Sequence, residues 1–87
     1  MAPSFARYVM SFRQENTAWG DVARDVSADP NVEETWGWRR LHGHVAAAGG
    51  IPVVMRILEE MHRAYLAGLE RSVVARRLRF ENLRSSE

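Results

Sequence analysis

Three aspartates at helical spacing are the most concentrated set of chemically capable side chains in the sequence. Asp21, Asp25 and Asp29 follow one another at intervals of four residues, which places three carboxylates on one face of a helix. Like charges at this spacing repel, and Asp29 near the carboxyl end of the helix opposes the helix dipole. Two interpretations are open: an acidic docking face for a basic protein partner, or a solvated face whose carboxylates cap neighbouring backbone.

The three histidines do not have the spacing of a metal site. His42 and His44 are two residues apart, so on a helix they point about 160° apart and cannot share one ion. His62 is distant in the sequence, and no carboxylate stands four residues from any of the three histidines to complete a set. The chain contains no cysteine, which excludes a thiolate zinc site and a disulfide framework. We therefore expect neither a metal nor a cofactor.

No catalytic motif appears in the chain. There is no Ser-His-Asp arrangement, no glycine-rich phosphate loop and no positioned carboxylate pair, so we expect no enzyme and no small-molecule substrate. No run of eighteen apolar residues is present, and the amino terminus lacks a basic segment followed by a long apolar one. We expect no membrane partner and a cytoplasmic location.

All twelve basic residues are arginines, and two groups of them are candidate binding residues. Arg39 and Arg40, with Arg56, can form a basic patch opposite the aspartates; the alternative is ordinary surface charge paired with nearby glutamates. Residues 1–68 hold seven arginines and eight acidic residues, giving −1, whereas residues 69–87 hold five arginines and three acidic residues, giving +2. The C-terminal group consists of Arg71, Arg76, Arg77, Arg79 and Arg84.

Apolar residues alternate with these C-terminal arginines at a heptad-like spacing. The apolar positions step by 3, 4, 7 and 3 residues, and we name them the seam: Leu66, Leu69, Val73, Phe80 and Leu83. Three uses are open: the seam packs on a partner or a second copy, the arginines contact nucleic-acid phosphates, or the seam packs back on the domain's own core.

Apolar residues at intervals of three and four predict short helices throughout. Thr17 is a good cap and Asp29-Pro30 a stop, while Gly49-Gly50 ends a third helix and Pro52 suits the first turn of a fourth. The fourth either continues through Gly68 to about Leu83 or breaks there into a fifth helix. The predicted helices are about Ser4 to Arg13, Ala18 to Ala28, Trp36 to Ala48 after a Thr35 cap, and from near Val53 onwards.

These stripes predict one hydrophobic core. Of the three tryptophans, Trp19 and Trp38 are expected in the core, and Trp36 is expected to be the most exposed. The predicted core is Phe5, Tyr8, Val9, Phe12, Trp19, Val22, Val26, Trp38, Leu41, Val45, Ile57, Leu58, Met61 and Tyr65.

A set of mostly apolar positions recurs along the helices: Ser4-Phe5, Tyr8, Phe12-Arg13, Val22-Ala23, Asp25-Val26, Asp29, Leu41, Val45, Leu58 and Tyr65. Their spacing resembles that of the YozE-like family of small bacterial proteins of unknown function, over roughly residues 4–67. The resemblance implies a fold like the sterile alpha motif and carries no catalytic activity. The broader fold often serves protein–protein association and sometimes nucleic-acid binding.

The sequence therefore predicts an all-α bundle of four to five helices, resembling the sterile alpha motif. We expect a helical domain at residues 1–68 and an arginine-rich helical extension at residues 69–87. The predicted function is a non-enzymatic module that binds a protein partner or itself. The alternative is a small nucleic-acid-binding protein that uses the C-terminal arginines.

Overall fold

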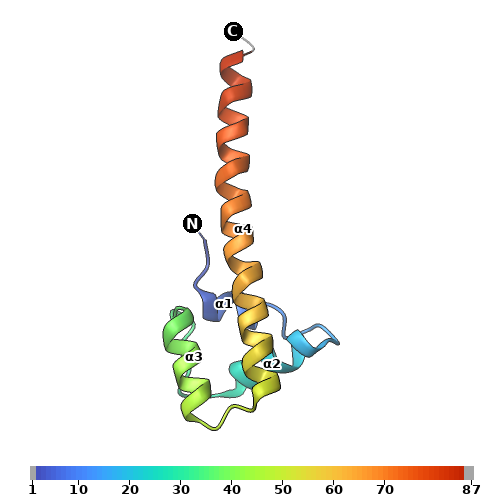
Figure 1. The fold of residues 1–87 in the computed structure, drawn as a ribbon, viewed down its shortest axis with the longest axis vertical. Helices are drawn as coiled ribbons and strands as arrows, with labels where there is room; N and C mark the ends of the chain where they lie inside the picture. Colours follow the sequence, from blue (N-terminus) through green and yellow to red (C-terminus); the bar gives the residue numbers. More distant parts are fainter. Residues whose placement is uncertain (1, 86–87) are drawn as a thin grey trace.

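Four α-helices joined by short connections make up the described part of the protein (Figure 1). The computed structural model describes the backbone of residues 2–85 and the side chains of residues 2–69. The helices are α1 (Phe5–Met10), α2 (Ala18–Ala28), α3 (Trp38–Ala47) and α4 (Pro52–Ser85). No strand occurs between residues 2 and 85, so the predicted all-α bundle of four to five helices is confirmed, with four.

The helix ends follow local capping chemistry. Thr17 Oγ1 accepts a hydrogen bond from the Gly20 amide at 3.1 Å, and Ser4 Oγ accepts one from the Arg7 amide at 3.2 Å. Each bond satisfies an amide that has no partner within its own helix. Gly49, just after α3, has a φ of 88°, a left-handed conformation that suits glycine. The predicted bounds of α2 are confirmed.

The core lies where α1 meets the other three helices, all of which it contacts. The ring of Phe5 packs edge-on against Trp38 at 5.4 Å and Tyr65 at 5.6 Å between centroids. The predicted residues Tyr8, Phe12, Trp19, Trp38, Val45, Ile57 and Tyr65 are only partly buried, but they pack against the core. The buried core is Phe5, Ala6, Val9, Val22, Ala23, Val26, Trp36, Leu41, Leu58 and Met61.

The prediction that Trp36 is the most exposed tryptophan is wrong, because this side chain is only 8% exposed. The third helix begins at Trp38 with Gly37 as its cap, so Trp36 belongs to the preceding turn rather than to a helix. Its amide donates to the Glu33 carbonyl at 3.1 Å, and its carbonyl accepts from the Ala6 amide at 3.0 Å. The backbone bond to α1 holds this turn against the core and buries the indole.

The first helix is shorter than predicted, because regular α-helix ends at Met10 rather than near Arg13. The amides of Phe12 and Arg13 donate to carbonyls three residues back, at 3.1 and 3.2 Å. This tighter winding turns the chain towards α2. Phe12 still packs edge-on against Trp19, with ring centroids 5.1 Å apart.

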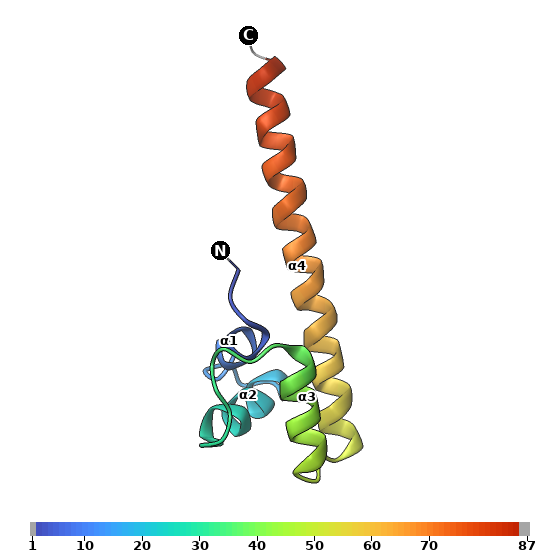
Figure 2. The same ribbon diagram turned by 90° about the vertical axis from the view of Figure 1, so that its left-hand side faces the viewer.

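The last helix continues through Gly68 without a break and extends far beyond the other helices (Figures 1 and 2). Both views show its C-terminal half with no other described segment beside it. The Cα radius of gyration is 16.1 Å, whereas a compact chain of this length has one of about 12 Å. We call residues 70–85 of α4 the projecting segment; a backbone placed this way cannot pack on the domain's own core.

Candidate functional site

An apolar groove of about 280 Å³ lies between α2 and the turn that joins α3 to α4. Val22 and Val26 of α2 form one wall. Val45 of α3, with Val54 and Leu58 of α4, forms the other. These positions follow helical spacing on each element, and the groove exists because α2 and the α3–α4 turn do not close completely on each other.

The α3–α4 turn brings further apolar side chains to the groove. Gly50 donates its amide to the Val45 carbonyl at 2.9 Å, and a Cβ on Gly50 would lie 2.8 Å from Met55 Sδ. The chain is therefore closely packed around Gly50, which has no side chain to clash with Met55. Directly after it, Ile51 lines the groove while remaining 59% exposed, and Val53 is 56% exposed. Ile51 is therefore a large exposed apolar side chain at the edge of an apolar groove, whereas Val53 does not line the groove.

Two of the three predicted aspartates, Asp25 and Asp29, also line the groove. Asp29 Oδ2 lies 2.8 Å from His44 Nε2, and its Oδ1 accepts the Asn31 amide at 2.9 Å. The bonds to His44 and Asn31 lower the pKa of the Asp29 carboxyl below its ordinary value. Asp25 is exposed, and within residues 2–69 no hydrogen bond or ion pair engages its carboxylate. The groove thus carries one engaged and one available carboxylate.

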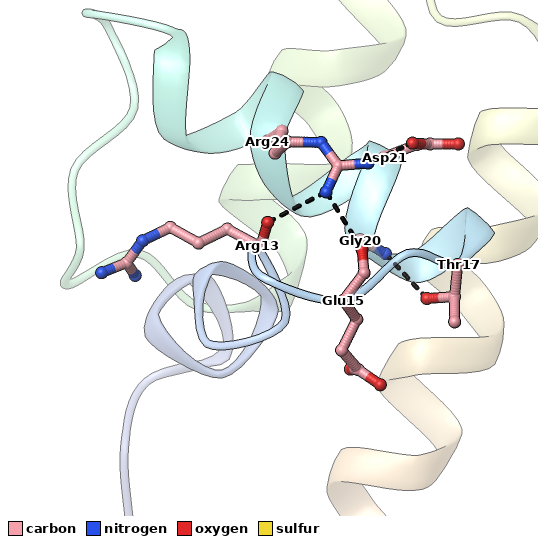
Figure 3. Close-up of polar contacts among 6 residues, drawn as sticks. All are labelled: Arg13, Glu15, Thr17, Gly20, Asp21 and Arg24. Carbon is pink, nitrogen blue, oxygen red and sulfur yellow. Dashed lines mark hydrogen bonds and ion pairs between the residues drawn. The ribbon is translucent and has the colours of Figure 1, made fainter.

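The third aspartate, Asp21, belongs to a different contact, in the first turn of α2 beside the α1–α2 turn (Figure 3). Its carboxylate pairs with Nη2 of Arg24. Nη1 of the same guanidinium donates to the carbonyl oxygens of Arg13 and Glu15, both at 3.0 Å. Arg24 thereby holds the α1–α2 turn against α2, and Asp21 orients Arg24. The three aspartates share a helix, but only Asp25 and Asp29 line the groove.

The basic candidates lie on two other parts of the molecule. Arg39 and Arg40 are exposed on α3, and the Arg40 guanidinium sits 4.7 Å from the centroid of the Trp36 ring. This cation–π contact gives Arg40 a packing role besides its charge. The C-terminal candidates lie on the projecting segment, where side chains are outside the described residues: Arg71, Arg76, Arg77, Arg79 and Arg84.

The histidines occupy three separate environments. His44 pairs with Asp29, His42 Nε2 lies 4.0 Å from Glu59 Oε1, and His62 stacks on Trp38 with centroids 4.2 Å apart and planes at 5°. Burial lowers the pKa of His62, since desolvation disfavours the imidazolium. Among residues whose side chains are described, no group of three histidine, cysteine, aspartate or glutamate side chains is placed to hold a metal ion.

Sequence reasoning missed the groove and the role of Arg24. One available signal was the run Ile51-Pro52-Val53-Val54 at the start of the fourth helix. Consecutive apolar residues cannot all face one core from a helix, so some of them had to be exposed. Arg24 gave no such signal, because its partners are backbone carbonyls 9 and 11 residues away.

No protein-family model, curated protein or solved structure matches this chain. Among the helices whose residues are described, none is long and apolar enough to cross a lipid bilayer. The surfaces that stand out on physical grounds are the acidic-edged groove and the projecting segment, at opposite ends of α4.

Proposed function

We propose that this protein is a non-enzymatic interaction module that binds a second protein chain through the C-terminal half of α4. The observation that carries the proposal is the course of that helix. It is 34 residues long, and its C-terminal half has no other described helix beside it (Figures 1 and 2). Helical segments this short are marginally stable alone in water. A partner that covers one side of the segment would stabilise it.

The seam supplies the contact surface in this proposal. Its first residue, Leu66, is 48% exposed at the point where α4 leaves the other helices. In the sequence, Leu69, Val73, Phe80 and Leu83 continue from Leu66 at heptad-like spacing, the pattern typical of helices that pack against another helix. A YozE-like assignment and a cytoplasmic location are parts of the same proposal, resting on the sequence resemblance and on composition.

The proposal is tested by measuring the mass of the full chain by sedimentation over a wide concentration range. We expect association that the double variant Val73→Glu/Phe80→Glu removes. The control is Ala75→Glu/Asn82→Glu, which adds the same charge to the same segment at positions off the heptad seam. A wild-type chain that stays monomeric at every concentration would refute association with itself, and equal behaviour of the two variants would refute the role of the seam.

A second candidate function is nucleic-acid binding by the C-terminal arginines. It is favoured by five arginines in residues 69–87, a net charge of +2 there, and a helix that stands clear of the other helices. Phosphate contacts weaken steeply with salt, whereas apolar packing does not. Fluorescence anisotropy of labelled duplex DNA at low and physiological salt distinguishes the two, because salt-sensitive binding supports this candidate and its absence at low salt excludes it.

A further inference from the structure

The groove and the projecting segment have complementary chemistry. The groove offers apolar walls, the exposed Ile51 and the carboxylate of Asp25, and no arginine lines it. The projecting segment carries apolar residues interleaved with arginines, within a C-terminal region of net charge +2. An amphipathic helix laid into an apolar groove with opposite charge at its edge is a recurrent mode of protein recognition.

The two surfaces cannot meet within one chain. Val54 and Leu58, near the start of α4, form part of the groove wall, and Phe80 lies on the same unbroken helix. A rise of 1.5 Å per residue places Val54 and Phe80 about 40 Å apart along the axis. A straight helix cannot bring its end back to its beginning, so the segment that fills the groove must come from another molecule.

We propose that the projecting segment of one copy docks into the acidic-edged groove of a second copy. The inference rests on the proposed function, for which it names the partner and the receiving surface. The groove volume of about 280 Å³ falls at or below the lower end of small-molecule pockets, about 300–1,000 Å³. A space of that size suits a few apolar side chains of a docked helix, with Asp25 facing an arginine beside them.

Such a contact joins two different surfaces, so it leaves an open groove at one end of the assembly and an open segment at the other. A contact of this kind continues into a chain of molecules unless its rotation closes a ring. Sedimentation of the 87-residue chain should therefore show a mass that rises with concentration beyond two chains. Pairing of two seams in a coiled coil would instead stop at a defined oligomer.

The test uses variants of the whole 87-residue chain, each of which disables one surface. Asp25→Arg/Ile51→Arg adds positive charge to the groove at two exposed positions. Gln14→Arg/Glu15→Arg makes the same change in charge on exposed residues that do not line the groove. We expect the groove variant to be monomeric and this control to assemble like the wild type. Thermal melts of both variants establish that they are folded.

Mixing provides the decisive measurement. The groove variant keeps its segment, and Val73→Glu/Phe80→Glu keeps its groove, so each is expected to be monomeric alone and the mixture to form pairs of two chains. Association that survives in the groove variant but not in the seam variant overturns this inference and leaves the proposed function standing. A wild-type chain that never associates overturns both. Two monomeric variants that fail to pair when mixed also overturn the inference.

Discussion

The substitution Gly20→Ala should destabilise the protein, although alanine is the better helix former. Gly20 is buried in the first turn of α2, directly beneath the α1–α2 turn (Figure 3). A Cβ at this position would lie 1.9 Å from the Glu15 carbonyl oxygen and 2.8 Å from the Glu15 carbonyl carbon. The oxygen would be about 1.5 Å short of an ordinary van der Waals distance. Because both atoms belong to the backbone, no side-chain rotation relieves the overlap.

The expected magnitude follows from what the displacement disrupts. Overpacking a close contact costs about 1–3 kcal/mol, and moving the Glu15 carbonyl also disturbs its hydrogen bond from Arg24. The gain from replacing glycine by alanine in a helix is at most about 1 kcal/mol. We therefore expect a net loss of about 2 kcal/mol in the free energy of unfolding, which lowers the Tm of a domain of this size by about 8–16 °C.

Gly43→Ala is the matched control. Gly43 lies exposed in the middle of α3, and a Cβ there would meet nothing within 4 Å beyond its chain neighbours and the adjacent backbone of its own helix. The same substitution should therefore stabilise the protein by about 0.5–1 kcal/mol. The assay is thermal unfolding followed by circular dichroism at 222 nm. A Gly20→Ala variant that melts at or above the wild-type temperature would refute the close backbone approach at this position.

Two other predictions concern the core and the groove. Leu58→Ala, at a fully buried position, should lower the free energy of unfolding by about 2–5 kcal/mol. Leu66→Ala, at a position 48% exposed, should change it by about 0.5 kcal/mol or less. Equal urea midpoints for the two variants would contradict the assigned core. The pKa of the Asp29 carboxyl is lowered from 3.8 in the folded state, chiefly by its hydrogen bond with His44. The ionised carboxylate therefore stabilises the folded protein above pH 3.8, and this stabilisation is lost as the pH falls below it. Urea unfolding between pH 6 and 2.5 should show that the free energy of unfolding falls less at acid pH in Asp29→Asn than in the wild type. Identical pH profiles would count against the Asp29–His44 pair.

Local chemistry is the part of this protein that the sequence alone determined. The Thr17 cap, the positive φ of Gly49 and the start of α4 at Pro52 depend on residues a few positions apart. Capping bonds, a left-handed glycine and a first-turn proline depend on neighbouring residues, so these helix boundaries were predictable. The predicted Thr35 cap was wrong, because α3 begins at Trp38 after Gly37. The periodic stripes also predicted much of the core, including Phe5, Leu41 and Met61.

Contacts between distant parts of the chain decided the rest. The burial of Trp36 depends on a backbone hydrogen bond to Ala6, 30 residues away, which a helical pattern around Trp36 does not reveal. The three aspartates differ in their surroundings, because Arg24 engages the carboxylate of Asp21 and His44 engages that of Asp29. The groove depends on how closely α2 approaches the α3–α4 turn. Periodicity tells which residues share a face of a helix, but only the packing of the helices determines what covers that face.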